Sequence, residues 1–591
     1  MADSNYQNWS KDRLVERVKE LEEELKRQEQ NPVVKQKHPQ PPASTSGSAP
    51  ATPVNPGPQK KEKKKKKPSK LDPSKYSTRL VALKLAYLGK RYGGFEYQAG
   101  VTVPTIEEEL WKALVKSCLI WPEQPDKVDF GPWEYSKCGR TDRGVSAFGQ
   151  VIGIRVRSNR PVVAAVDDEP GKGGGDDGDG DAEMVGAENQ GEGEGVGPDE
   201  GKPAWDPIAD EINYPRVLNR LLPPDIRVLA WAPTLPADFS ARFSCWERQY
   251  RYFFTQPAFS PLPASLDPSG ARGKEGWLDI DAMRKAAKLF EGVHDFRNFC
   301  KVDGAKQITN FKRRVFEADI VEVEDMGSAL PYLEQQDYKP ASLEEGKPYP
   351  KVYYFHVRGS AFLWHQIRHM VAVLFLIGQG LEKPSLVTDL LDVDKHPRKP
   401  NYAMADEVPL VLWDCIFPKV DETMSKKAAQ DVHDPDVEGD PNLQDAIDWV
   451  WLGEDKPAHL HGASGMVDQL WEYWRERKMD ELLANRLLDS VARKADLSRR
   501  LAEPGPPEKP SSSQRVYEGG NTAKASGTYV PVLKKQLQAT PEEINDKWAQ
   551  SKGFASAEEL ARTKNWRSVI KANKNGGSSN AAGDTGSSID E

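Results

Sequence analysis

The sequence is poor in cysteine and lacks any long apolar run. Its five cysteines include no Cys-x-x-Cys pair, and no histidine lies beside them at the spacing of a zinc motif. No run of about 18 apolar residues and no apolar N-terminal segment of the signal-peptide type is present. We therefore expect a soluble protein of a reducing intracellular compartment, with no metal, no disulfide framework and no membrane partner.

Apolar residues are also scarce, since only 38% of the 591 residues are hydrophobic, so much of the chain cannot form packed core. The 46 glycines and 46 prolines are unevenly placed, which indicates a compact region with long polar insertions and tails. The net charge of −8 argues at first against a polyanionic partner. Acidic residues, however, crowd residues 167–200 and the region after 420, so the folded part can still present a basic face.

The N-terminal region has two recognisable segments. In residues 1–30, apolar residues recur in heptad steps from Leu14 to Leu25, which favours either a short coiled coil or a lone solvated helix. Residues 31–76 form a Pro-, Ser- and Lys-rich segment that we expect to be a disordered basic linker. Its lysine run at 63–67 fits nuclear import, phosphate contact or plain solvation. We expect the protein in the nucleus and the cytoplasm.

Hydrophobic patterning predicts an α+β core in two halves, each an antiparallel sheet flanked by helices. The first half spans 77–236, with an acidic disordered insertion at 159–204, and the second spans 237–420. Residues 421–591 are expected to be a partly helical extension with a disordered tail. The expected strands are 81–87, 150–156, 225–230, 250–254, 316–320 and 352–358. The expected helices are 105–114, 217–221, 279–290, 362–377, 466–475 and 479–492.

The most informative string runs from Tyr135 to Gln150. Gly139 and Gly144 bracket the sequence Arg-Thr-Asp-Arg, a pattern that suits a tight loop projecting Asp142 between two guanidinium groups. Such neighbours would hold the carboxylate ionised. A surface turn with a structural salt bridge explains the same spacing, so the residues alone leave both interpretations open.

This string resembles the signature loop of the TruA family of tRNA pseudouridine synthases, an Arg-Thr-Asp-x-Gly-Val run whose aspartate is the nucleophile. Four further stretches resemble that family in the same order and extend the similarity over about 79–418. These stretches are 87–98, 218–228, 239–252 and 359–371. The resemblance implies the pseudouridine synthase fold, a tRNA substrate and a reaction that needs neither metal nor organic cofactor.

The resemblance also implies roles for four residues. Asp142 would be the nucleophile, which either adds to the ribose or base or removes a ribose proton so that a glycal forms. Tyr250 would stack on the target uracil and take part in proton transfer at C5. Arg368 would pair with Asp142 and keep it charged. Arg140 would fill the space left by the flipped base, or else bind a phosphate or carboxylate. Six further basic residues either line a phosphate cleft or are ordinary solvated charges: Lys90, Arg91, Arg143, Arg242, Arg248 and Arg251.

Two short stretches, 136–150 and 294–303, resemble the eukaryotic branch that modifies tRNA positions thirty-eight and thirty-nine, beside the anticodon. The alternatives are a sibling branch acting on other tRNA or small nuclear RNA uridines, a non-catalytic tRNA-binding protein, and an aspartate-nucleophile hydrolase. Members of the family often pair as dimers, so a homodimer is one candidate state. Three histidines, His294, His365 and His369, are interpreted as capping or packing residues rather than ligands.

Overall fold

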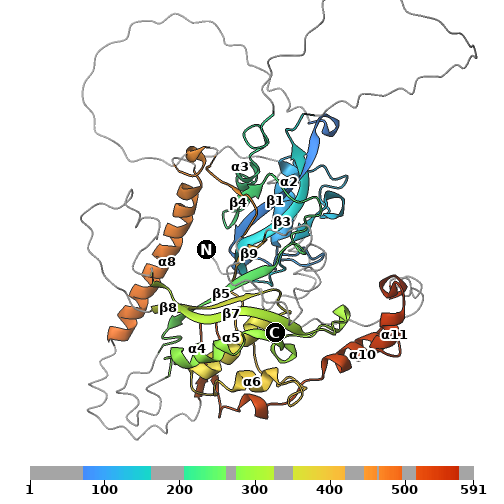
Figure 1. The fold of residues 1–591 in the computed structure, drawn as a ribbon. Helices are drawn as coiled ribbons and strands as arrows, with labels where there is room; N and C mark the ends of the chain where they lie inside the picture. The colour runs from blue at the N-terminus through green and yellow to red at the C-terminus, as the bar shows by residue number, and fades with distance from the viewer. Residues whose placement is uncertain are drawn as a thin grey trace, which may run out of the picture. The chain divides into compact units, whose positions relative to one another are not determined.

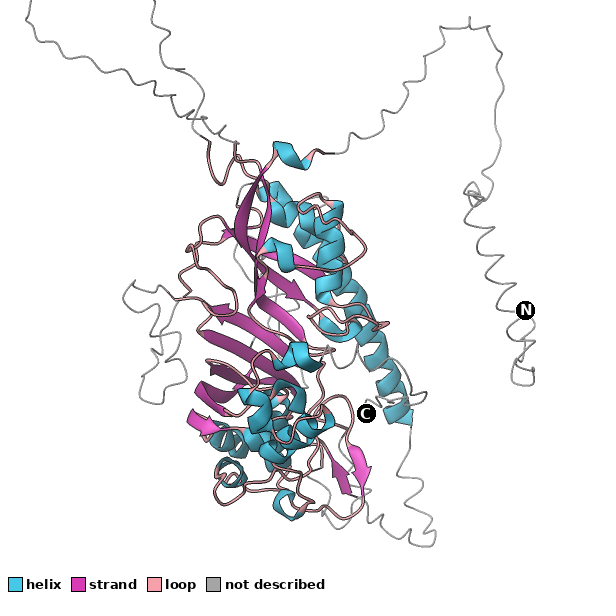
Figure 2. Cartoon of the chain, turned by 90° about the vertical axis from the view of Figure 1, so that its right-hand side faces the viewer, coloured by secondary structure: helices cyan, strands magenta, loops and turns pink. Residues whose placement is uncertain are grey.

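The computed structural model describes residues 71–161, 205–260, 275–324, 351–418, 445–454, 456–461, 465–494 and 514–570 (Figures 1 and 2). The expected N-terminal coiled coil lies outside these residues, as do nearly all of the basic linker, most of the acidic insertion and the last part of the tail. Among the described residues, no helix combines the length and the apolar character that crossing a membrane requires.

The centre of the fold is a ten-stranded sheet with the order β10-β4-β1-β3-β9-β5-β8-β7-β6, to which β2 is added beside β3 (Figure 1). Its strands are β1 (Ser77–Tyr87), β2 (Ser136–Lys137), β3 (Ser146–Ser158), β4 (Ile226–Ala232), β5 (Glu247–Gln256), β6 (Gly292–Asp295), β7 (Lys312–Glu322), β8 (Lys351–Gly359), β9 (Leu410–Ile416) and β10 (Val450–Trp451). A separate hairpin contains β11 (Gln514–Val516) and β12 (Lys524–Ser526). The six strands expected from alternation are all present.

Strand β9 joins the two halves of the core into this single sheet. It pairs antiparallel with β5, where Tyr250 faces Leu412, and parallel with β3, where Ser146 faces Val411 and Ala147 faces Leu412. All other pairs in the sheet are antiparallel. The expected α+β class is confirmed, with one continuous sheet in place of two separate ones.

The α-helices of the described residues are α2 (Ile106–Lys116), α3 (Tyr214–Asn219), α4 (Ile280–Lys288), α5 (Gln366–Gly378), α6 (Leu386–Leu391), α8 (Met466–Lys494), α10 (Pro541–Ser551) and α11 (Ala557–Arg562). Five of them, α2 to α6, pack on this sheet and bury two hydrophobic cores, whereas the others contribute to neither core (Figure 2). The side chains of Thr105 and Asp279 cap α2 and α4 as expected, each accepting a hydrogen bond from a backbone N–H of the first turn.

Two helix predictions need correction. Helix α5 begins at Gln366, four residues after the expected start, because His365 has a φ of 59° and breaks the helical path there. The two helices expected between 466 and 492 are one continuous helix, α8. No glycine or proline interrupts that segment, so nothing in it ends a helix.

Candidate active site

The loop between β2 and β3, residues 139–145, is anchored by buried polar side chains. The Gln150 amide is fully buried, accepting from the Gly139 N–H at 3.0 Å and donating to the Gly139 carbonyl at 2.7 Å. The Tyr87 hydroxyl lies 2.7 Å from Oγ1 of Thr141. These contacts satisfy buried polar groups and fix the loop at Gly139 and at Thr141.

Two glycines let this loop pass close to its neighbours. Gly144 has a φ of +80°, and a Cβ there would lie 2.5 Å from Cγ of Glu407. Gly94 has a φ of +107°, and its Cβ would meet the Thr141 carbonyl oxygen at 3.0 Å. Both positions therefore require glycine for conformation and for space. The 139–145 loop can then lie close against Gly94 and Glu407, with Asp142 held in a defined direction.

The carboxylate of Asp142 faces the segment that leads into α5. Its Oδ1 accepts a hydrogen bond from Nε1 of Trp364 at 3.2 Å, and its Oδ2 lies 3.4 Å from Nε2 of His365. The Asp142 side chain is 29% exposed, so it is reachable from solvent yet largely enclosed. An acid that is accessible and oriented in this way suits a nucleophile.

Burial is the largest influence on Asp142 and raises the pKa of its carboxyl group. The charge of Arg368, the hydrogen bond from Trp364 and the charge of Lys306 oppose this and lower the pKa, whereas the charge of Glu407 raises it. The charge of Arg368 thus favours the ionised form, as expected, but removing the carboxylate from water outweighs the nearby positive charges. A raised pKa increases the intrinsic nucleophilicity of the carboxylate once it is ionised.

Arg368 lies on α5, as expected, but it pairs with a different acid. Its Nη2 donates to Oε2 of Glu407 at 2.7 Å, and its Nε donates to the Ala405 carbonyl at 2.7 Å. The expected ion pair with Asp142 is replaced by this one, because the chain entering β9 brings Glu407 within reach of the guanidinium. Arg368 thus acts on Asp142 through its charge rather than through a bond.

Tyr250 lies in β5, between β8 and β9, and contacts both hydrophobic cores. Its ring meets Phe362 edge to face with the centroids 5.3 Å apart. Phe362 belongs to the same short segment as Trp364 and His365, so Tyr250 and Asp142 both contact the approach to α5. Burial raises the pKa of the Tyr250 hydroxyl far above its usual value, so the phenol is neutral at neutral pH.

Arg140 is more than half exposed and pairs with an acid outside the loop. Its Nη1 is 3.3 Å from Oε2 of Glu96, whose other oxygen pairs with Lys137 at 3.0 Å. Of the partners considered for Arg140 from the sequence, the structure without tRNA shows a carboxylate, that of Glu96. Exposed ion pairs of this kind contribute little to stability, roughly 0–1 kcal/mol, so Arg140 can be released to another partner.

Several groups around Asp142 were not identified from the sequence. His365 was interpreted as a capping or packing residue, but its side chain caps nothing and its ring faces Asp142. Burial and nearby cations lower the pKa of His365 to about 3, so the imidazole is neutral. Lys301 and Lys306 each place Nζ 4.8 Å from the Trp364 ring centroid. The sequence pointed to Trp364 and His365 as site residues only through their place inside the stretch 359–371, which resembles the family.

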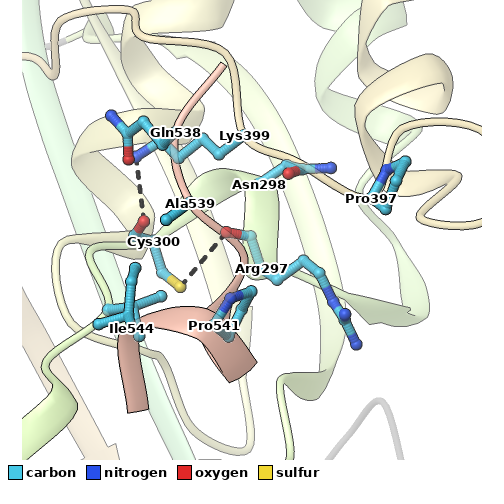
Figure 3. A pocket seen from close by; sticks show the side chains of 10 residues that line it. Arg297, Asn298, Cys300, Pro397, Lys399, Gln538, Ala539, Pro541 and Ile544 are labelled. Atoms are coloured by element: carbon cyan, nitrogen blue, oxygen red, sulfur yellow. Dashed lines mark hydrogen bonds between the residues drawn. The ribbon is translucent and has the colours of Figure 1, made fainter. Parts of the chain in front are cut away.

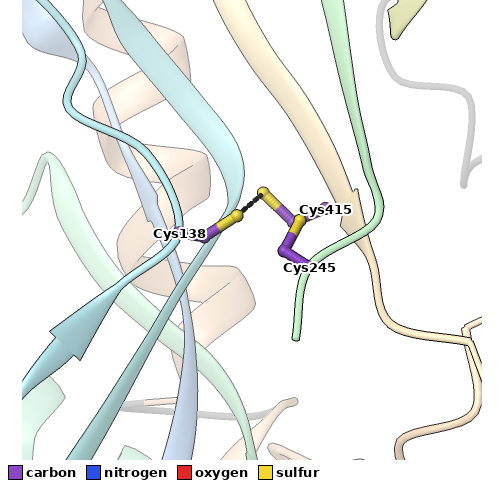
Figure 4. A group of neighbouring side chains, drawn as sticks. All are labelled: Cys138, Cys245 and Cys415. Atoms are coloured by element: carbon purple, nitrogen blue, oxygen red, sulfur yellow. Dashed lines mark hydrogen bonds between the residues drawn. The ribbon is translucent and has the colours of Figure 1, made fainter. Parts of the chain in front are cut away.

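Three cysteines that are far apart in sequence meet below the loop (Figure 4). Cys138, Cys245 and Cys415 are buried, their sulfurs lie within 4.8 Å of one another, and Cys138 and Cys415 share a hydrogen bond at 3.0 Å. Burial raises the pKa of the Cys138 thiol, but hydrogen bonds from the other two cysteines and the charge of Arg248 bring it well below its usual value.

The distance between the Cys138 and Cys415 sulfurs is too short for two ligands of one zinc ion. Two sulfurs on one zinc ion, each about 2.3 Å from it, would lie roughly 3.8 Å apart, which is longer than the 3.0 Å found here. Arg248 also donates from Nη2 to the Cys138 carbonyl at 3.2 Å, which places a positive charge beside the sulfurs. The guanidinium is thus held by the loop backbone, so the candidate cleft residue Arg248 is a structural cation of the loop.

Comparisons with known proteins agree with this architecture. The family model described as tRNA pseudouridine synthase matches residues 286–418. A Bos taurus protein named tRNA pseudouridine(38/39) synthase is 38% identical over 423 residues, covering 71% of this chain and 69% of its own. The Saccharomyces cerevisiae protein of that name is 37% identical, covering 71% of this chain and 73% of its own. An archaeal tRNA pseudouridine synthase A, from Methanothrix thermoacetophila, is 29% identical over 53% of this chain and 74% of its own. This chain belongs to the tRNA pseudouridine synthase family.

Proposed function

We propose that this chain isomerises uridine to pseudouridine at positions 38 and 39 of tRNA, with Asp142 as the nucleophile. The names of the bovine and yeast relatives support these positions. The observation that carries the proposal is the placement of Asp142, which meets Trp364 and His365 in a partly open, glycine-bounded loop. The same loop carries the Arg-Thr-Asp-x-Gly-Val run.

The reaction breaks the bond from C1′ to N1 and forms a bond from C1′ to C5, while C5 loses a proton and N1 gains one. No external electron or group is consumed, so side chains can supply all the chemistry. Asp142 attacks the ribose or the base, or it takes a ribose proton on the glycal route. The Trp364 N–H orients one oxygen of Asp142, and the other remains beside the neutral imidazole of His365.

The target uridine must leave its base stack before Asp142 reaches it, at a cost of a few kcal/mol. In this proposal the uracil stacks on the Tyr250 ring, which the edge of Phe362 holds in place. The exposed Arg140 leaves Glu96 and enters the vacated position in the tRNA. A weak surface ion pair makes that exchange inexpensive.

Mapping pseudouridine on a defined tRNA tests the proposed positions. The purified full-length chain is incubated with an unmodified tRNA transcript carrying uridine at positions 38 and 39, and carbodiimide adducts are mapped as reverse-transcription stops. We expect stops at both positions and none in a matched transcript with cytidine there. Stops elsewhere would identify the sibling branch, and tRNA binding without any stop would identify a non-catalytic binding protein.

We also propose that the protein is a homodimer joined through α8. This helix carries an exposed apolar stripe in which the side chains of Leu483, Leu487 and Val491 recur at every fourth position and are each about two-thirds exposed. Exposed leucines in such a row are typical of a helix that packs on another helix. Symmetric dimers most often join the same surface of two copies, so a second copy of α8 is the proposed partner of the stripe.

Light scattering coupled to size-exclusion chromatography measures this association. The double substitution Leu483→Glu and Leu487→Glu should convert a dimer to a monomer, because it would bury charges without partners in the helix interface. Asn485→Glu adds the same charge on the opposite side of α8 and should leave the dimer intact. A wild-type chain that elutes as a monomer would refute the assignment.

A further inference from the structure

A C-terminal segment outside the matched family region packs beside the active site. Residues 536–538 run along the chain at 399–401, where the Asn401 N–H donates to the Gln536 carbonyl at 2.8 Å and the Gln538 N–H donates to the Lys399 carbonyl at 2.8 Å. Figure 3 shows the narrow pocket that remains between the two parts, which is lined by Lys399 and Cys300 from one part and by Gln538 and Ile544 from the other. The segment then continues into α10.

Helix α10 presses directly on the turn formed by residues 303–308. A Cβ on Gly304 would lie 2.8 Å from Cβ of Trp548 and 3.0 Å from the Ile544 carbonyl oxygen, so nothing larger than glycine fits beneath the helix. Asn545 is buried and donates from Nδ2 to the Ile308 carbonyl at 3.0 Å. These contacts fix the turn at its beginning and at its end.

The backbone conformation of Gln307 also makes the 303–308 turn depend on contacts with α10. Its φ of +51° is in the left-handed region that non-glycine residues seldom occupy, so the turn needs outside contacts to hold its shape. The Gln307 side chain supplies one by donating from Nε2 to the Asn545 carbonyl at 3.2 Å. The turn therefore takes its conformation partly from α10.

This turn reaches Asp142 through one side chain. Lys306, at the end of the 3-10 helix Gly304–Lys306, places Nζ 4.8 Å from the Trp364 ring centroid. Trp364 in turn donates its indole N–H to Asp142 at 3.2 Å. The charge of Lys306 also acts on Asp142 directly. A shift of the turn would thus change both the orientation and the electrostatic surroundings of the carboxylate.

We infer that α10 is a positioning element of the reaction: Trp548 and Asn545 hold the 303–308 turn so that Lys306 and Trp364 fix Asp142. Neither residue touches the substrate in this assignment, and both act through the turn. The inference rests on the proposed function, in which Asp142 is the nucleophile. It assigns part of the C-terminal extension to the active site, although the extension lies outside residues 286–418.

The variant Trp548→Ala tests this inference in the full-length chain. We expect kcat for pseudouridine formation to fall about 10-fold, since displacing a positioned group by a fraction of an ångström carries costs of this order, while the Kd for tRNA stays within about 2-fold. Trp548→Phe should restore most of the rate. Lys547→Ala, an exposed residue on the same helix, is the matched control and should leave both constants unchanged.

A double-mutant cycle separates positioning from a general loss of structure. If α10 acts through Lys306, adding Trp548→Ala to Lys306→Ala should reduce kcat by less than about 2-fold further, because the contact it supports is already gone. Fully multiplicative losses in the double variant would overturn the inference. So would a wild-type kcat in Trp548→Ala.

Hydrogen exchange at residues 303–309 keeps the inference testable without activity. Exchange should accelerate there in Trp548→Ala and in the smaller change Asn545→Ala, and remain unchanged in Lys547→Ala. If the wild-type chain forms no pseudouridine, the proposed function fails while this measurement still reports whether α10 holds the turn. Unaltered exchange in both variants would overturn the role of α10, whatever the activity.

Discussion

The variant Asp142→Asn is expected to lose pseudouridine formation by at least about 10³-fold, because the amide cannot act as a nucleophile. The same change should leave the melting temperature equal to or above that of the wild type. The reason is that burial raises the pKa of Asp142, so ionising it costs folding free energy. Initial rates on a tRNA transcript and differential scanning calorimetry at neutral pH measure the two effects.

The sign of the stability effect follows from the direction of the shift. A carboxyl group whose folded pKa lies above its unfolded value contributes stability below the unfolded pKa, and this contribution is lost as the pH rises through the folded pKa. Asparagine is uncharged at every pH, so the variant should gain relative stability as the pH rises through that window. Retained activity in Asp142→Asn would show that Asp142 is not the nucleophile. A large drop in melting temperature would contradict the burial argument.

The variants Arg368→Met and Glu407→Gln should shift the acid limb of the rate profile in opposite directions. The charge of Arg368 lowers the pKa of Asp142 and the charge of Glu407 raises it. Removing the arginine should therefore move the acid limb of kcat to higher pH and reduce the rate at neutral pH by about 10- to 100-fold, with partial recovery in alkaline buffer. Removing Glu407 should move the limb to lower pH.

These two variants also control for each other, because both break the same ion pair at 2.7 Å. A purely structural role for the pair would reduce the rate in both variants, with no shift of the profile. Circular dichroism at each pH separates unfolding from titration. Shifts in the same direction would show that the pair reaches Asp142 by geometry rather than by charge.

The sequence predicted elements well where a local pattern carries the information. Alternating apolar residues in β1 and the caps at Thr105 and Asp279 are properties of a few neighbouring residues, and the structure has them at those positions. Strand β9 was not predicted, because its identity depends on pairing with β3 and β5, which are distant in sequence. Without β9, the two halves were expected to form separate sheets, whereas the structure has one continuous sheet.

The surroundings of the candidate site were harder to predict for the same reason. The string around Asp142 identified the loop and the family, but the contact of Arg368 with Glu407 depends on how the chain enters β9. The meeting of Cys138 with Cys245 and Cys415 likewise depends on three elements converging. The direction of the pKa shift of Asp142 required knowing its burial, which the charges of neighbouring residues in the sequence cannot supply.

The seam between β3 and β9 also has a consequence for protein synthesis. Gly144 packs against Glu407, and a Cβ on Gly149 would lie 2.6 Å from Cα of Asp414, so the first half is lined by residues made much later. Domains generally fold as they leave the ribosome, N-terminal part first. Here the part of the β3 edge at Ser146 and Ala147 must wait for its partners in β9 until more than 250 further residues have been translated. A nascent chain that stalls before residue 410 exposes that edge and is a natural client for chaperones.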